Sequence, residues 1–248
     1  MNIHDYLDRI NYHGSLDPNS TTLRALHEAH LLHVPFENLS IHAQQPIVLN
    51  DEALYHKIVV KRRGGFCYEL NGVFAWLLRS LGFEVAMLAA GVTRNDGGFG
   101  PDFDHMALVV MLDQRWLVDV GFGDSFRQPL LFDERNAQIQ GQRRYQLQDD
   151  GDHLIMLEGK NDEGLKPQYR LAKTTHEFAD YVAMCHYHQT SPDSGFTKGR
   201  ICSIATPHGR ISLSETQLII TEQEQRIELP INNAEFDRVL AEYFVIVM

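Results

Sequence analysis

The chain has 248 residues, and 44% of them are hydrophobic, which is enough for a packed core in one large domain or in two to three small ones. Its formal net charge of −11 argues against nucleic acid or an anionic membrane as a bulk partner. Three cysteines without a CxxC pair, no signal-peptide pattern and no apolar run near the roughly 18 residues of a membrane span predict a cytoplasmic protein with reduced thiols.

Residues 1–82 are predicted to be helical. Thr21 or Thr22 and Asn50 could cap two of the helices, Pro35 ends the second, and Gly82 follows the last as a C′ glycine. Apolar residues recur at helical spacing in four stripes: Ile3, Leu7 and Ile10; Leu23, Leu26, His30 and Leu31; Ala53, Leu54 and Ile58; Leu70, Val73, Phe74, Leu77, Leu78 and Leu81.

The pattern changes to strands in 83–173, with apolar runs at 84–92, 106–112, 115–120, 144–148 and 153–158. In the tail, 174–248, a helix is expected to open at Thr175, and Asn233 could cap a final helix. Four short strands are expected between them, at 201–205, 210–213, 217–221 and 225–229. The order predicts an α+β fold in three segments.

One cysteine occupies a position in the chain that is suited to catalysis. Cys67 follows two glycines and lies in or just before the first turn of the predicted helix that ends at Gly82. Free backbone N–H groups and the helix dipole stabilise an anion there, which predicts a lowered pKa and a nucleophilic thiolate. A purely structural cysteine is the competing interpretation, since free cysteines are among the most buried residues.

A base and an orienting acid are available on one predicted hairpin. His105 opens the strand 106–112, a short turn follows, and Asp119 lies in the returning strand at a similar distance from the turn. An acid among apolar neighbours is costly without a partner, and an imidazole N–H is a suitable one. Cys67, His105 and Asp119 thus form a candidate Cys–His–Asp triad. The plainer alternatives are a half-exposed histidine and an aspartate at a turn or edge.

The segment RGGFCYELN (residues 63–71) closely resembles the active-site signature of the arylamine N-acetyltransferases, bacterial members included. Three more segments fit this family in its order: VPFENL (34–39), VDVGFG (118–123), and SPDSGFT (191–197) followed by RICS (200–203). One departure is Gly195, where bacterial members often carry proline before the phenylalanine, and it concerns the lid near Phe196 rather than the triad.

The resemblance implies an N-terminal helical bundle, a central antiparallel β-barrel and a C-terminal α/β lid around a cysteine-protease-like catalytic core. It implies transfer of an acetyl group from acetyl-CoA to aromatic amines or hydrazines through an acetyl-cysteine, with ping-pong kinetics. It also suggests that Phe36, Phe122 and Phe196 line the acceptor pocket, and that Arg63 and Glu37 form a structural ion pair beneath the helix of Cys67.

Other expectations come from the residues themselves. The backbone N–H of Tyr68, which follows the nucleophile, could stabilise an oxyanion. Gly121 and Gly123 could let the backbone approach the pantetheine or a phosphate of coenzyme A. No zinc-ligand spacing occurs, so no metal is expected. His186 and His188, two residues apart on a predicted helix, point to different faces. A homodimer is possible.

Two other classes of protein remain open on the sequence. A cysteine hydrolase or transglutaminase-like enzyme would use the same three residues but pass the acyl group to water or to peptide lysines. A non-catalytic ligand-binding protein would simply bury Cys67.

Overall fold

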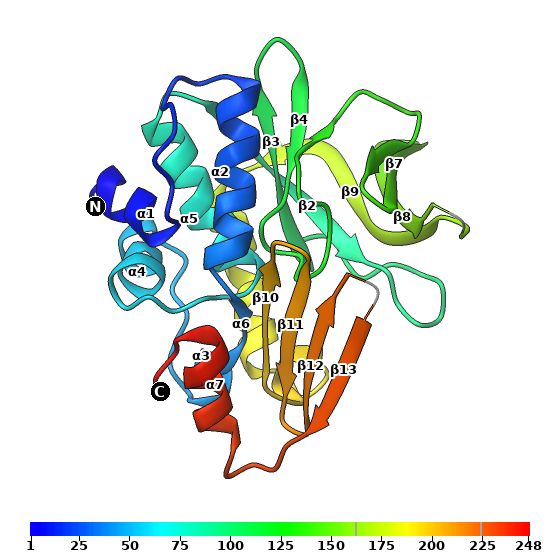
Figure 1. Cartoon of the computed structure of the whole chain (residues 1–248). Helices are drawn as coiled ribbons and strands as arrows, with labels where there is room; N and C mark the ends of the chain where they lie inside the picture. Colours follow the sequence, from blue (N-terminus) through cyan, green and yellow to red (C-terminus); the bar gives the residue numbers. More distant parts are fainter. Residues whose placement is uncertain (162, 224) are drawn as a thin grey trace.

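The computed structural model describes residues 1–161, 163–223 and 225–248. Helices of the first part of the chain lie beside an eight-stranded antiparallel sheet that curls into a nearly closed barrel, and a five-stranded sheet lies below it (Figure 1). This mixed α+β architecture confirms the predicted class. None of the helices in the described ranges has the length and apolar character that crossing a membrane requires.

The helical part contains α1 (Ile3–Arg9), α2 (Ser20–His33), α3 (Leu39–His42), α4 (Asp51–Tyr55), the π turn η1 (His56–Val60) and α5 (Cys67–Ser80). Asn50 caps α4 as predicted, because its side chain accepts the Ala53 N–H at 2.8 Å. The cap predicted for α2 is wrong. The helix begins at Ser20, and Asn19 accepts the N–H of Thr22 at 2.9 Å.

The eight-stranded sheet has the order β5-β4-β3-β2-β9-β8-β7-β6. Its strands are β2 (Glu84–Val92), β3 (His105–Met111), β4 (Arg115–Val118), β5 (Leu130–Leu131), β6 (Gln138–Gln140), β7 (Arg143–Asp150), β8 (His153–Lys160) and β9 (Lys166–His176). The hairpin of β3 and β4 was predicted, whereas β9 was not. β9 joins the two halves of the sheet by pairing with both β2 and β8.

The helix expected to open at Thr175 starts later, because Thr175 still pairs with Leu88 in the sheet. A 3-10 turn, η2 (Phe178–Tyr181), leads into α6 (Val182–Thr190), and a second short turn, η3 (Gly195–Thr197), follows. β9 therefore extends beyond residue 173, where the second segment is expected to end.

The second sheet has the order β1-β10-β11-β12-β13. It contains β1 (Phe36–Glu37), β10 (Ile201–Thr206), β11 (Gly209–Ser214), β12 (Gln217–Glu222) and β13 (Gln225–Pro230), and α7 (Phe236–Phe244) packs on it. The cap predicted at Asn233 is wrong, since α7 begins at Phe236 with Glu235 before it. Because β1 comes from the helical part of the chain, the first and last parts share a sheet.

Strand β3 is buried on both faces, which explains its continuous apolar run. Met106, Leu108 and Val110 pack into the core around α5, while Ala107 and Val109 pack inside the barrel. The strand thus separates two cores and carries His105 at its start. This placement sets the base of the candidate triad against the helix that carries Cys67.

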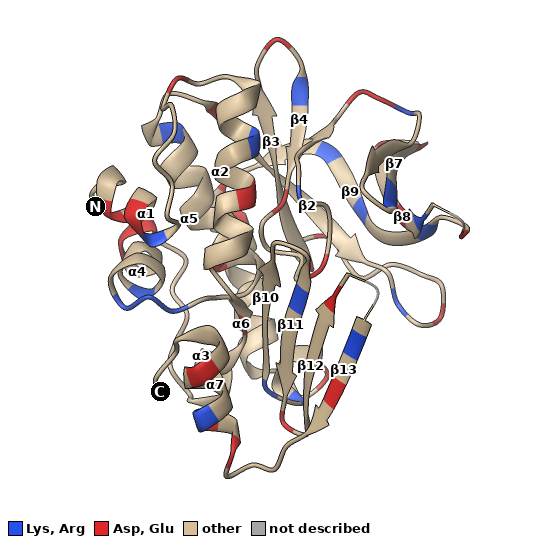
Figure 2. Ribbon diagram, in the orientation of Figure 1, with Lys and Arg blue, Asp and Glu red and all other residues tan. Residues whose placement is uncertain are grey.

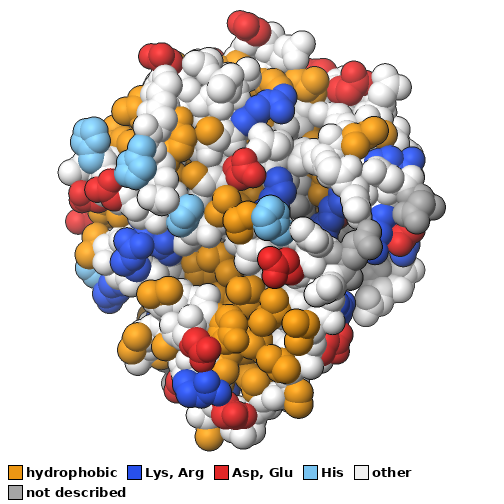
Figure 3. Space-filling model, in the orientation of Figure 1, with side chains coloured by type: hydrophobic (Ala, Val, Ile, Leu, Met, Phe, Trp, Pro, Cys, Tyr) orange, Lys and Arg blue, Asp and Glu red, His pale blue; other side chains and the backbone are white. Residues whose placement is uncertain are grey.

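The surface is mixed in charge, with residues of both signs on the helices and on both sheets (Figure 2). Apolar side chains gather over the five-stranded sheet (Figure 3). There the strand register aligns Ile204, Ile211, Ile220 and Ile227 in one row across four strands. Ile227, at the sheet edge, is half exposed.

Candidate active site

Cys67 is the first residue of α5 and is only 3% exposed. The glycines before it are needed for close approach. A Cβ on Gly64 would lie 2.0 Å from the carbonyl oxygen of Pro35, so only glycine lets this segment pass beside β1. Glu69 caps the helix start by accepting the N–H of Phe66 at 3.2 Å. The signature therefore folds into a tightly packed helix start with the thiol in its first turn.

The environment of the thiol differs from the expectation. Burial raises the pKa of Cys67 well above its usual range, and the charge of Asp119 raises it further, while the N–H of Met106 works in the opposite direction. The predicted lowering is therefore wrong, because burial outweighs the helix N-terminus. A thiolate here needs a positive partner, and a protonated His105 is the group that can supply it.

His105 and Asp119 form a buried pair. The Nε2 of His105 lies 2.8 Å from the Oδ2 of Asp119, and the two residues are 2% and 1% exposed. Burial acts to raise the pKa of Asp119, but the charge of His105 and hydrogen bonds from His105, Asn71 and the Gly121 N–H hold it below its ordinary value. Since Nε2 faces the carboxylate, Nδ1 is the ring atom left to exchange a proton with the thiol.

Asn71, which lies one helical turn after Cys67, connects the helix to the pair. Its Nδ2 donates to the Oδ1 of Asp119 at 2.9 Å and to the carbonyl oxygen of Met106 at 2.6 Å. Its Oδ1 accepts the Val120 N–H at 3.0 Å. No role was predicted for this residue, although it stands in the RGGFCYELN segment. Its i, i+4 spacing from Cys67, which places the two residues on one helix face, was the available signal.

Cys67 lies beside the backbone of two residues, Met106 and Gly121, that are close in the chain to His105 and Asp119. The N–H of Met106, the residue after His105, acts to lower the pKa of the thiol. On the other side, a Cβ on Gly121 would lie 2.7 Å from the Cα of Cys67. Across the described residues, no hydrogen bond joins Cys67 to the His105 ring. The structure thus brings the three predicted residues to one place from α5, β3 and the segment after β4.

Aromatic rings surround this place in two groups. Phe122 lies edge-on to the His105 ring at 5.2 Å between centroids, and Tyr169 of β9 lies at the same distance from that ring. Phe196 lies 5.4 Å from Phe66 and 6.2 Å from Phe36. The three predicted pocket phenylalanines are all half-buried and sit beside the triad segments. Tyr169 was missed because its strand was missed.

The structure also places the three backbone positions for which a role was predicted, namely Tyr68, Gly121 and Gly123. The N–H of Tyr68 pairs with no backbone carbonyl among the described residues, so it is free to donate. Gly121 packs against Cys67, which explains the need for glycine there without any ligand. Gly123 has a positive φ of 84° and open space where a side chain would lie.

A family model described as N-acetyltransferase matches residues 20–248. The arylamine N-acetyltransferase of Escherichia coli strain K12 is 31% identical over 229 residues, covering 91% of this chain and 81% of the relative. That of Mycolicibacterium smegmatis is 33% identical over 228 residues, covering 89% and 82%. The solved structure of the Mycobacterium marinum enzyme has a TM-score of 0.92 at 31% identity, covering 99% of this chain and 93% of that one.

The chain belongs to the arylamine N-acetyltransferase family. It is therefore an acyltransferase that acetylates aromatic amines, as the resemblance implied. The assignment favours an enzyme over a non-catalytic binding protein, and transfer to an amine over hydrolysis.

Beneath the catalytic helix of this acetyltransferase lies a buried charge network. Arg63 donates to the Oε1 of Glu37 at 2.9 Å, and Glu37 is fully buried. Lys57 lies 2.7 Å from Glu69 and 3.6 Å from Glu37. Since Glu69 caps α5, the network fixes the helix end that carries Cys67. The ion pair implied by the resemblance is present in the structure.

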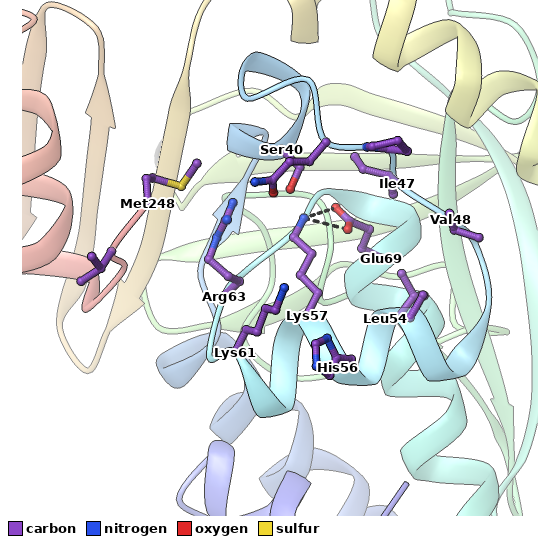
Figure 4. A pocket seen from close by; sticks show the side chains of 14 residues that line it. Ser40, Ile47, Val48, Leu54, His56, Lys57, Lys61, Arg63, Glu69 and Met248 are labelled. Carbon is purple, nitrogen blue, oxygen red and sulfur yellow. Dashed lines mark hydrogen bonds and ion pairs between the residues drawn. The ribbon is translucent and has the colours of Figure 1, made fainter.

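A cavity of about 660 Å³ opens onto this network (Figure 4). Lys57 and Glu69 meet in it, with Lys61 and Arg63 nearby and Met248 on another wall. None of the three triad residues lines it, so the cavity lies outside the chemistry. Within the described part of the chain, no group of three or more His, Cys, Asp or Glu side chains is arranged to hold a metal ion.

Proposed function

We propose that this enzyme moves an acetyl group from acetyl-CoA to an aromatic amine or hydrazine through an acetyl-Cys67 intermediate. The observation that supports this most directly is the buried His105–Asp119 pair at 2.8 Å, set against the first turn of α5 where Cys67 lies. A nucleophile, a base and an orienting acid are the parts that acyl transfer by a cysteine requires.

In the first half-reaction the Cys67 proton passes to Nδ1 of His105 as the sulfur attacks the thioester carbon of acetyl-CoA. Asp119 stabilises the resulting imidazolium through Nε2. The N–H of Tyr68 donates to the oxygen of the tetrahedral intermediate. The carbon–sulfur bond to coenzyme A then breaks, the leaving thiolate takes the proton from His105, and acetyl-Cys67 remains.

In the second half-reaction a neutral amine attacks the acetyl-Cys67 carbonyl and gives its proton to His105. The Cys67 thiolate leaves and is reprotonated, which returns the enzyme to its starting state. Phe36, Phe122 and Phe196 hold the aromatic ring of the acceptor. In this scheme residues 1–82 supply the nucleophile, 83–173 the base and acid, and 174–248 the lid that carries Phe196.

For the donor, a solved structure of the Mycobacterium marinum arylamine N-acetyltransferase in complex with CoA has a TM-score of 0.92 to this chain at 31% identity. We expect coenzyme A to enter beside the loop of Gly121 and Gly123, since the open space at Gly123 leaves its backbone accessible. The core that carries the triad would then correspond to the cysteine-protease-like core implied by the resemblance.

The test is to mix the protein with acetyl-CoA alone, quench with acid and measure intact mass. One added acetyl group is expected, lost in Cys67→Ala and discharged when an aromatic hydrazine is supplied. Steady-state data should give parallel double-reciprocal lines. Turnover along intersecting lines without any mass shift would contradict the covalent role of Cys67. Continued release of CoA without hydrazine, beyond one equivalent per enzyme, would favour the hydrolase alternative.

A further inference from the structure

His27 contacts both ends of the loop that carries the active-site acid. It lies in the middle of α2 and is fully buried. Its Nδ1 lies 2.9 Å from the carbonyl oxygen of Arg127, and its Nε2 lies 3.2 Å from the carbonyl oxygen and 3.4 Å from the backbone nitrogen of Asp119. These two residues begin and end the loop 119–127, so one ring spans its two ends.

The protonation of the ring follows from its partners. The carbonyl oxygen of Arg127 can only accept, so Nδ1 carries a proton and donates to it. Burial lowers the pKa of His27 to about 4, although the Arg127 carbonyl and the charge of Asp119 oppose this. The ring is therefore neutral at neutral pH, and its unprotonated Nε2 faces the backbone of Asp119, where the N–H is the group from which it can accept.

Packing fixes the ring in this position. It stacks on Phe126, with centroids 5.7 Å apart and planes 11° from parallel, and it meets Phe74 of α5 edge-on at 6.3 Å. Phe126 belongs to the same loop and is fully buried. The loop is thus attached to α2 by two hydrogen bonds and a stacked pair of rings.

The loop 119–127 holds several groups of the proposed mechanism. The carboxylate of Asp119 faces His105, Gly121 packs on Cys67, and Phe122 lies against the His105 ring. At the far end, the Arg127 guanidinium donates to the carbonyl oxygens of Thr206 and Gly209 at 2.7 and 2.6 Å. The loop therefore joins the helical part, the triad and the second sheet.

We infer that His27 is a positioning residue, which holds the two ends of the loop 119–127 so that Asp119 and Phe122 stay in register with His105 and Cys67. The inference rests on the proposed role of Asp119. It differs from the support given by Asn71, which holds the carboxylate and the following N–H. His27 holds the backbone from the opposite helix.

The experiment compares His27 with a matched neighbour, His30, which lies one turn later in α2. His30 is equally buried, its Nδ1 pairs with the Tyr6 hydroxyl at 2.9 Å, and its ring meets Phe74 at 5.1 Å. No contact joins it to the loop 119–127 among the described residues. Replacing either histidine by phenylalanine exchanges a buried polar ring for an apolar one. Only His27→Phe also removes the hydrogen bonds to the loop 119–127.

In His27→Phe, amide hydrogen exchange in the 119–127 peptide should accelerate about tenfold or more relative to His30→Phe, since two hydrogen bonds to the loop are lost. Alkylation of Cys67 by iodoacetamide and its acetylation by acetyl-CoA should both slow about tenfold, whereas His30→Phe should stay near wild type. His27→Gln, which can still donate and accept, should fall between the two.

Hydrogen exchange does not depend on the reaction, so it separates this inference from the proposed function. Equal exchange in the loop for the two phenylalanine variants would overturn the inference, whatever the activity. Faster exchange with unchanged alkylation of Cys67 would also overturn it, because the loop would then move without affecting the thiol. If His27→Phe does not fold, His27→Gln and His30→Gln are compared by the same criteria.

Discussion

Asn71 donates a hydrogen bond of 2.9 Å to the carboxylate of Asp119 from the helix that carries Cys67 one turn earlier. Nucleophile and acid are thereby tied to one rigid element, although 48 residues separate Asn71 from Asp119 in the chain. The distance from the thiol to the base then depends on the packing of α5 against β3, because Asn71 also binds the carbonyl of Met106.

Asn71→Ala should cost about 2–4 kcal/mol of stability, because the buried Met106 carbonyl and Val120 N–H lose their partner. It should also lower kcat/KM by about tenfold or more. Urea unfolding and steady-state kinetics measure the two effects. Asn71→Asp keeps the shape but sets a second carboxylate beside Asp119, so a fully active Asn71→Asp would contradict this role.

Asp119→Asn should leave the fold nearly intact and lower activity by on the order of a thousandfold. The Asn71 amide would hold the new side chain's oxygen, so its NH₂ group would face His105. The ring would then keep its proton on Nδ1 and could not take the thiol proton. Calorimetry and kinetics check this, with Asp133→Asn as the control for losing an acid, since Asp133 pairs with Arg115 at the surface. Activity within tenfold of wild type at an unchanged Tm would mean that Asp119 is not the orienter.

Cys67 should be the thiol that iodoacetamide modifies fastest at neutral pH, and His105→Gln should slow this by more than about tenfold. Burial and the charge of Asp119 raise the pKa of Cys67, so the thiolate forms only with a positive partner. Burial also raises the pKa of Cys185, to about 12, and that of Cys202. Peptide mapping gives the rates. Equal rates for the three cysteines, or no effect of His105→Gln, would count against the pair.

Phe196→Ala should raise the KM for an aromatic acceptor by roughly tenfold or more, as expected for losing one buried aromatic contact. The rate at which acetyl-CoA alone acetylates Cys67 should change little, because donor transfer precedes acceptor binding. Phe99→Ala is the matched control, since Phe99 is also half-buried but contacts Arg170 instead. Equal effects on the two half-reactions would place Phe196 outside the acceptor pocket.

Stability should fall as the pH is lowered from about 6.5 towards 4. The pKa of His27 is about 4 in the folded protein and about 6.5 when unfolded, so the unfolded chain binds the extra proton first. Above pH 6.5 the neutral His27 ring therefore contributes about 3 kcal/mol to the free energy of unfolding, and this contribution is lost on acidification. Thermal melts at several pH values should show a flatter profile for His27→Phe than for wild type; parallel profiles would argue against a buried neutral ring.

The local features were predictable from the sequence. The helix from Cys67 to Ser80, the hairpin of β3 and β4 and the proximity of His105 to Asp119 follow from apolar spacing and from short turns. Features that depend on distant partners were not. Strand β9 is rich in charged and polar residues on its exposed face, so no apolar run marks it, and Tyr169 was missed with it.

The pKa of Cys67 also could not be predicted from local sequence patterns. A helix start can be located in the sequence, but the depth at which it is buried depends on β3, Gly121 and Asn71 closing around it. The contacts of His27 could not be predicted from the sequence either. Nothing local distinguishes it from His30, and only the fold shows which of the two histidines meets the loop 119–127.

The position of β9 in the barrel has a consequence for biosynthesis. β2 pairs with β3 on one side and with β9 on the other, and β9 is made long after Cys67 has left the ribosome. Until then one edge of β2 is open, and the ring of Tyr169 is absent from His105. The nascent chain therefore carries the Cys67 thiol before the strand that places Tyr169 beside His105 has been made. During the same interval the edge of an apolar strand is unpaired, which favours aggregation of the nascent chain.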